Sequence, residues 1–220
     1  MIIRSETPDF TTAILDLDGT LLDSTWLWHD IDVKFLAKRG IPAPRDYMEN
    51  IKTLNYEIGA AYTKKRFGLA LGEKAIIDEW HAMALEAYRN SIRLKPYAAQ
   101  FLQFLAERGV SIVAATASDE SLYLPCLARC GILSYFSSIT QTREVNRDKG
   151  APDVYLRAAR KAGARPDECI VVEDTLRSIQ GAKAGGFFTV GVADPGSADL
   201  EGVIRETADL FVQNLGELIV

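Results

Sequence analysis

Two acidic residues follow the first short apolar run of this 220-residue chain. The run 12–15 ends at Asp16, and Asp18 comes two positions later, directly before Gly19 and Thr20. Carboxylates at this spacing can serve as a nucleophile, as a proton donor or acceptor, or as cation ligands. Gly19 permits a tight bend and close approach of a ligand, and Thr20 adds a hydroxyl and a backbone donor. Taken alone, the segment is also consistent with an ordinary turn, because Asp-Gly is a common turn pair.

A second acidic pair, Glu173 and Asp174, follows the apolar run 169–172. If both runs are strands of one parallel sheet, the two acidic pairs face each other at the same edge. Their mutual repulsion is relieved when a divalent cation occupies the gap between them. An acidic pair at a strand end is otherwise often a solvated loop.

Hydroxyl and cationic groups stand at two further places along the chain. Thr116, Ala117 and Ser118 follow a second apolar run and offer hydroxyls and backbone N–H groups suited to a phosphate oxygen. Thr116 or Ser118 is equally suited to cap the helix that follows. Lys149 is a single cation close to the start of another predicted helix, where a lysine is usually an ordinary surface residue.

The elements that must position these residues alternate between strand and helix, which predicts an α/β fold with a doubly wound, mostly parallel sheet. Apolar runs and helical periodicity predict strands over 12–15, 110–115, 169–172 and 188–192, and helices over 98–108, 122–130, 153–162 and 176–184. In such sheets the ligand lies at the carboxyl ends of the strands. The residues that follow the strands are therefore the candidates for chemistry.

The segment between the first strand and the next is helical almost throughout, from Thr25 to Asn90. This pattern predicts a helical cap domain over 24–95, inserted into a core domain formed by 1–23 and 96–220. Ile31, Phe35 and Leu36 have the spacing of one buried helix face.

Composition excludes several classes of protein. The formal net charge is −5, from 25 basic and 30 acidic residues, so nucleic acid is not an expected partner. No stretch has the apolar length of a membrane span, and the opening segment 1–6 does not resemble a signal peptide. The cysteine count of 3 rules out a fully paired disulfide framework. We expect a cytoplasmic protein without membrane partners.

The candidate residues together resemble the four motifs of the haloacid dehalogenase-like hydrolase superfamily. The matching residues, in the order of that family's motifs, are Asp16-Leu17-Asp18-Gly19-Thr20, Thr116, Lys149 and Glu173-Asp174. The helical insertion is similar to the cap of the phosphoglycolate phosphatase and β-phosphoglucomutase branch. The resemblance implies a Rossmannoid α/β core with an α-helical cap and a small-molecule phosphate ester as substrate. We expect a monomer or weak dimer.

The resemblance also implies roles for the acidic residues. Asp16 would be the nucleophile that forms an aspartyl phosphate, and Asp18 would protonate the leaving group and then deprotonate water. Mg²⁺ would be the cofactor, bound by Asp16, by the backbone carbonyl of Asp18 and by Asp174. Glu173 would either bind the ion directly or contact the groups that bind it.

The phosphate group would be held by the remaining motif residues. By the same resemblance, Lys149, Thr116 and the Ala117 N–H would contact the phosphoryl oxygens, and the turn at Gly19 and Thr20 would contribute backbone donors.

Within the family, Asp18 argues against dehalogenases and phosphonate hydrolases, which lack it. Trp28 stands where the mutases of this branch carry a histidine, with His29 one position out of register. Asp119 and Glu120 stand where mutases tend to continue with a lysine. The sequence therefore favours a phosphatase, with a phosphosugar mutase as the alternative. A non-catalytic binding module is the third hypothesis, which the complete set of motif residues disfavours.

Overall fold

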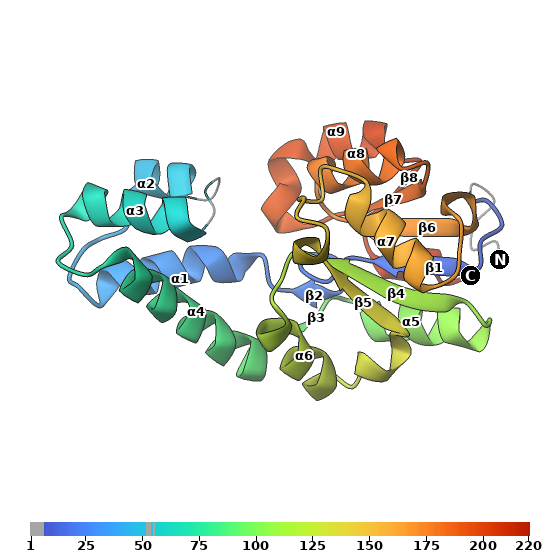
Figure 1. Ribbon diagram of the computed structural model, residues 1–220, viewed down its shortest axis with the longest axis horizontal. Helices are drawn as coiled ribbons and strands as arrows, with labels where there is room; N and C mark the ends of the chain where they lie inside the picture. The colour runs from blue at the N-terminus through green and yellow to red at the C-terminus, as the bar shows by residue number, and fades with distance from the viewer. Residues whose placement is uncertain (1–6, 52–53, 55) are drawn as a thin grey trace. The chain divides into compact units, whose positions relative to one another are not determined.

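The computed structural model describes residues 7–51, 54 and 56–220, and the chain forms two compact units (Figure 1). We call Met1–Thr25 with Ile92–Val220 the core, and Trp26–Ser91 the cap. The predicted insertion over 24–95 is therefore longer at both ends than the unit in the structure. The opening segment 1–6, predicted not to be a signal peptide, lies outside the described residues.

The linkers to the cap belong to the core because they pair with each other. Strand β2 (Leu22–Asp23) lies antiparallel to β3 (Arg93–Leu94) in a two-stranded sheet. The Lys95 amide also donates to the Leu21 carbonyl at 2.8 Å. These backbone hydrogen bonds fix both linkers before the chain enters the cap and after it leaves.

The core is built on a six-stranded sheet in which every neighbouring pair is parallel. In sheet order the strands are β5 (Ser138–Gln141), β4 (Ser111–Thr116), β1 (Thr12–Leu15), β6 (Cys169–Glu173), β7 (Phe188–Val192) and β8 (Leu210–Val212). The predicted α/β class is confirmed. The sequence pattern did not predict β5, β8 or the β2–β3 pair.

Strand β1 lies at the centre of the sheet, where the strand order reverses. Leu15 is level with Ala114 of β4 on one side and with Val172 of β6 on the other. Residues that continue from these three strands therefore emerge at the same height. Ligands of open α/β sheets bind in the crevice at such a reversal point.

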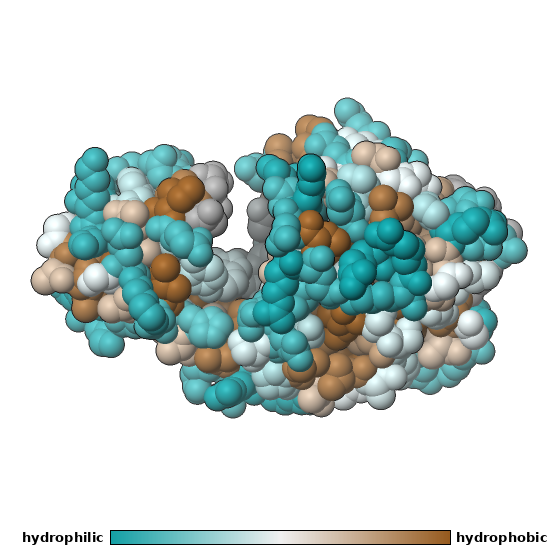
Figure 2. All heavy atoms as spheres, in the orientation of Figure 1, coloured by the Kyte–Doolittle hydropathy of each residue, from teal (hydrophilic) through white to brown (hydrophobic). Residues whose placement is uncertain are grey.

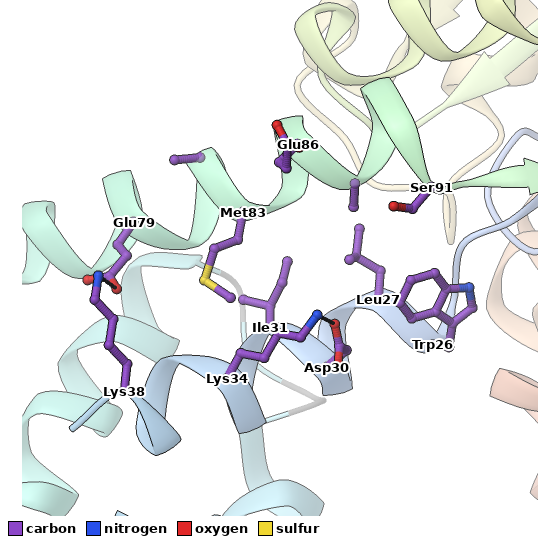
Figure 3. A pocket seen from close by; sticks show the side chains of 12 residues that line it. Trp26, Leu27, Asp30, Ile31, Lys34, Lys38, Glu79, Met83, Glu86 and Ser91 are labelled. Atoms are coloured by element: carbon purple, nitrogen blue, oxygen red, sulfur yellow. Dashed lines mark hydrogen bonds and ion pairs between the residues drawn. The ribbon is translucent and has the colours of Figure 1, made fainter. Parts of the chain in front are cut away.

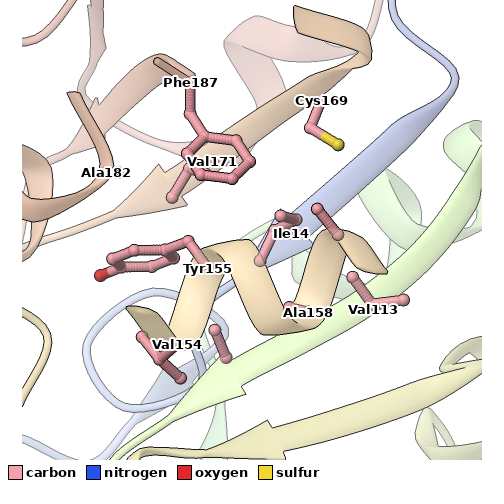
Figure 4. Packing of buried hydrophobic residues seen from close by; sticks show 11 residues of the cluster. Ile14, Val113, Val154, Tyr155, Ala158, Cys169, Val171, Ala182 and Phe187 are labelled. Atoms are coloured by element: carbon pink, nitrogen blue, oxygen red, sulfur yellow. The ribbon is translucent and has the colours of Figure 1, made fainter. Parts of the chain in front are cut away.

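The core helices are α5 (Ala98–Glu107), α6 (Glu120–Arg129), α7 (Asp153–Lys161), α8 (Leu176–Ala184) and α9 (Glu201–Thr207). The core also contains the short 3₁₀ helices η1 (Leu133–Tyr135), η2 (Thr142–Glu144), η3 (Pro166–Glu168), η4 (Pro195–Leu200) and η5 (Leu215–Leu218). The buried face of α7 packs on one side of the sheet, against side chains such as Ile14 and Val171 (Figure 4). The intervening residues of these strands are buried as well, because the sheet is covered on both faces.

The cap consists of α1 (Trp26–Ala37), α2 (Arg45–Ile51), α3 (Tyr56–Phe67) and α4 (Glu73–Asn90). Helix α4 contacts both α1 and α3. Ile31, Phe35 and Leu36 are buried, as the helical spacing predicts. The cap therefore has a hydrophobic core of its own.

A groove of about 540 Å³ runs between α1 and α4, lined only by cap residues (Figure 3). Leu27, Ile31 and Met83 contribute hydrophobic surface to it. Two ion pairs lie along its edges, Lys34 with Asp30 at 2.7 Å and Lys38 with Glu79 at 2.9 Å. The groove offers hydrophobic surface with paired charges.

The surface of the core carries both hydrophilic and hydrophobic residues on the face drawn in Figure 2. On the face drawn in Figure 2, hydrophilic residues dominate over α7, and hydrophobic residues form separate groups. No helix among the described residues is both long enough and apolar enough to cross a membrane.

A buried polar chain inside the cap predicts a pH-dependent stability. The Tyr47 hydroxyl lies 3.0 Å from Asp32 and 2.9 Å from the Thr63 hydroxyl, which donates to the Gly59 carbonyl at 2.8 Å. Burial raises the pKa of Asp32 to about 6, although the Tyr47 hydrogen bond opposes the shift. The folded state therefore holds this proton more tightly than the unfolded chain, and the stabilisation present at low pH is lost as pH rises through about 6.

Replacing Asp32 with Asn removes this titration while preserving the side-chain shape. We expect the free energy of unfolding of Asp32→Asn, relative to wild type, to increase by about 2–3 kcal/mol between pH 4 and pH 7.5. Urea unfolding at several pH values measures this difference, in which the other titrating groups cancel. Parallel pH curves for the two proteins would contradict the prediction.

Candidate active site

Three buried carboxylates meet at the carboxyl ends of the central strands. Asp16 continues from β1, Glu173 ends β6, and Asp174 follows it. Each offers an oxygen within 4.8 Å of the others, and the residues are 6%, 1% and 2% exposed, respectively. The structure thus brings together the two acidic segments that are far apart in the sequence.

Lys149 is the cation of this cluster. Its ammonium group donates to Asp16 Oδ1 and lies 2.7 Å from Glu173 Oε1. The loop that carries Lys149 passes directly against helix α8 at Gly181, where a Cβ would overlap the Lys149 carbonyl. A glycine at position 181 therefore allows the loop to deliver the lysine into the site. The alternative of a solvated surface lysine is wrong.

Burial and mutual repulsion control the protonation of the cluster. Burial raises the pKa of Asp174 to about 8, and Glu173 adds to the shift. Burial and Glu173 likewise raise the pKa of Asp16, against the opposing effect of Lys149. For Lys149 itself, burial acts to lower the pKa, but Asp16 and Glu173 raise it above its usual value. Three carboxylates around one ammonium leave an excess of negative charge, which a bound proton or cation can balance.

Gly19 shapes the turn next to the carboxylates. Its φ is 86°, and a Cβ at this position would overlap the Asp174 carboxylate. Thr20 is fully buried, and its hydroxyl has no hydrogen-bond partner among the described residues. The predicted role of this turn in phosphate binding stays a prediction.

Asp18 lies apart from the three-carboxylate cluster and is held by two hydroxyls. Ser24 donates to Asp18 Oδ1 at 2.6 Å, and Ser118 donates to Asp18 Oδ2. The Asp18 side chain is thereby held by partners different from those of Asp16. That the Asp18 backbone carbonyl contributes to metal binding is still a prediction.

Thr116 ends strand β4 and is fully buried. Its hydroxyl oxygen accepts a hydrogen bond from the Ser118 amide at 3.0 Å, across Ala117. The alternative in which Thr116 or Ser118 caps the next helix is wrong, because Asp119 is the N-cap of α6 and accepts from the Ser121 amide at 2.9 Å. Thr116 therefore lies just before α6 without capping it, and its contact with a phosphate group stays a prediction.

Sequence reasoning missed two residues of the site. Tyr155 on α7 donates its hydroxyl to Glu173 Oε1 at 2.8 Å, and Ser24 holds Asp18. Tyr155 occupies the apolar face of a helix, a position typical of a core residue. Ser24 follows the Asp16 motif closely, which is the one sequence signal that could have drawn attention to it.

The model of the haloacid dehalogenase-like hydrolase family matches residues 10–186. This chain belongs to the haloacid dehalogenase-like hydrolases. The matched segment contains every motif residue described above, so the predicted family membership is confirmed.

The curated relatives of this hydrolase include a phosphatase and a mutase. The fructose-1-phosphate phosphatase of Escherichia coli (strain K12) is 33% identical over 196 residues, covering 83% of the hydrolase and 96% of the relative. The beta-phosphoglucomutase of Bacillus subtilis (strain 168) is 28% identical over 220 residues, covering 93% of each. By contrast, the hydrolase spans only 48% of the bifunctional riboflavin kinase/FMN phosphatase of Arabidopsis thaliana, to which it is 28% identical over 184 residues, 82% of its own length.

Solved structures share the fold of the hydrolase. A HAD family hydrolase from Deinococcus radiodurans superimposes with a TM-score of 0.77 at 22% sequence identity, covering 96% of this chain and 94% of that one. At this identity the similarity establishes the fold alone, a parallel-sheet core with an inserted cap.

Proposed function

We propose that this hydrolase is a Mg²⁺-dependent phosphatase that cleaves a small-molecule phosphate monoester through an aspartyl phosphate on Asp16. The observation that carries the proposal is the placement of Asp16 at the reversal point of the sheet, buried beside Lys149 and two further carboxylates. A phosphatase among the relatives at 33% identity supports it.

The residues of the cluster fit a divalent cation. Glu173 Oε2 and Asp174 Oδ1 are buried and have no partner among the described residues. When all three carboxyl groups are ionised, they leave two negative charges beyond the one that the Lys149 ammonium balances, and the two positive charges of Mg²⁺ would neutralise these. Asp16, Asp174 and Glu173 would hold the ion, with the Asp18 carbonyl as the fourth protein group. When bound, Mg²⁺ would reduce the repulsion between the Asp16 carboxylate and the phosphate dianion.

Two proton-coupled steps complete the proposed reaction. Asp16 attacks phosphorus while the bond to the leaving oxygen breaks, and Asp18 donates its proton to that oxygen. Asp18 then accepts a proton from the water that attacks the aspartyl phosphate and regenerates Asp16. The hydrogen bonds from Ser24 and Ser118 would hold the Asp18 side chain in place for both transfers. Lys149, Thr116 and the amides of Ala117 and the Gly19–Thr20 turn would stabilise the phosphoryl oxygens.

The test is phosphate release from p-nitrophenyl phosphate and from a panel of sugar, nucleotide and short-acid phosphates, with Mg²⁺ and then with EDTA. We expect release that requires the metal. If the panel releases nothing but glucose 1-phosphate is isomerised in the presence of a sugar bisphosphate, the protein is a mutase, as the relative from Bacillus subtilis suggests. If neither phosphate release nor isomerisation is detected, a non-catalytic binding module is favoured.

Thr116 provides a graded test of the phosphate contacts. We expect Thr116→Ala to lower kcat/KM by about 10²–10³, because one preorganised donor to the phosphoryl group is lost. Thr116→Ser keeps the hydroxyl and serves as the matched control, with at most a small loss. Equal activity of the alanine and serine variants would remove Thr116 from the proposed phosphate site.

We also propose that the protein works in the cytoplasm, on a small molecule and without nucleic acid, as a monomer or weak dimer. Its three cysteines are free, which agrees with a reducing compartment.

A further inference from the structure

The two oxygens of Glu173 have different surroundings. Oε1 accepts hydrogen bonds from Lys149 at 2.7 Å and from the Tyr155 hydroxyl at 2.8 Å. Oε2 is buried and has no partner among the described residues. One oxygen is thus held by two donors, while the other has none in the part of the chain that the structure describes.

Tyr155 is itself rigidly placed. The residue is fully buried on α7, and its ring lies edge-on to Phe187 with centroids 6.2 Å apart. Figure 4 shows the ring packed within the hydrophobic cluster around Val171, with its hydroxyl pointing out of the cluster. Because the apolar contacts fix the ring, the hydroxyl can meet Glu173 without further loss of conformational freedom.

Lys149 alone would fix Glu173 less well. The lysine ammonium is shared with Asp16, and it must also serve the proposed phosphoryl group. Tyr155 is a neutral donor that contacts Glu173 from the helix side and leaves the net charge of the site unchanged. It can therefore hold Oε1 throughout a reaction in which the partners of Lys149 change.

We propose that Tyr155 is a positioning residue for metal binding: its hydroxyl holds Glu173 Oε1 and so presents Oε2 to the cation. The inference rests on the proposed function, since it concerns the same carboxylate cluster. Residues that hydrogen-bond to metal-binding carboxylates typically increase the metal affinity by about 10–100-fold. Tyr155 acts through Glu173 and needs no contact with the substrate.

The test compares Tyr155→Phe, which removes one oxygen, with wild type and with Tyr123→Phe, a buried core tyrosine on α6 as control. Mn²⁺ binding is followed by the EPR signal of the free ion, and Mg²⁺ affinity by competition. We expect about tenfold weaker binding of both ions by Tyr155→Phe and unchanged binding by Tyr123→Phe. Activity measured against Mg²⁺ concentration should show a higher half-saturating concentration, with most of kcat recovered at saturation.

A double-mutant cycle separates positioning from general loosening of the core. If Tyr155 acts through Glu173, adding Tyr155→Phe to Glu173→Gln should weaken Mn²⁺ binding no further. Unchanged affinity of Tyr155→Phe, or an equal additional loss in the double variant, would overturn the inference while leaving the phosphatase proposal in place. Absence of Mn²⁺ and Mg²⁺ binding by wild type would instead overturn the proposed metal site itself.

Discussion

Asp16→Asn is expected to lower phosphatase turnover by about 10⁴-fold or more. The amide cannot form the acyl phosphate, so the covalent route is closed, and only the surrounding donors remain to assist hydrolysis. The Asp16 side chain also contacts Lys149 and lies in the carboxylate cluster, so metal affinity should fall at the same time. Phosphate release under single-turnover conditions measures the loss.

The matched control for this substitution is Asp199→Asn, at an exposed aspartate outside the site. It removes the same charge and should leave turnover unchanged. Circular dichroism and thermal unfolding establish that both variants are folded. Equal turnover by Asp16→Asn and wild type would end the assignment of Asp16 as nucleophile.

Lys149→Met should have the second largest effect, on both activity and stability. The ammonium group bonds to Asp16 and Glu173, and the side chain is only 11% exposed. Methionine keeps the length of the side chain but leaves buried carboxylates without their cation, which costs about 3–5 kcal/mol of unfolding free energy in typical cases. We expect kcat to fall about 10³-fold, because the charge that balances the phosphoryl oxygens is lost.

Lys183→Met is the control for this experiment, because Lys183 forms an ion pair with Asp209 at the surface, at 2.6 Å. A pair of this kind contributes at most about 1 kcal/mol. Urea unfolding in EDTA measures both variants, and a second series with Mg²⁺ should recover part of the stability of Lys149→Met, since the cation replaces the missing charge. A loss no larger than that of Lys183→Met would show that Lys149 does not compensate the buried acids.

The parts of the fold that sequence predicts best are those with continuous apolar runs. Strand β6 (Cys169–Glu173) is buried on both faces, and its unbroken hydrophobic segment is unambiguous. Strand β5 (Ser138–Gln141) contains a single apolar residue, Ile139, and lies at the edge of the sheet, so its sequence carries no comparable signal. The β2–β3 pair is formed by two residues from each linker, and only the tertiary structure brings them together.

The same distinction applies to the site. Asp16, Lys149 and Glu173 are residue types whose charge makes them conspicuous next to strands and helices. Tyr155 was hidden because its helix position marks it equally as a core residue, and its contact with Glu173 depends on how α7 lies on the sheet. Local sequence predicts where reactive groups leave the strands, but the hydrogen bonds that orient them arise from packing.

The pairing of β2 with β3 also bears on how such an enzyme can change in evolution. The two linkers pair with each other as antiparallel strands, so the cap is a long insertion into a β-hairpin of the core. Lengthening a loop with fixed ends costs little chain entropy, so segments of very different length can be exchanged at this junction. The inserted segment can therefore be replaced while the sheet order and the carboxylates at its edge are inherited unchanged.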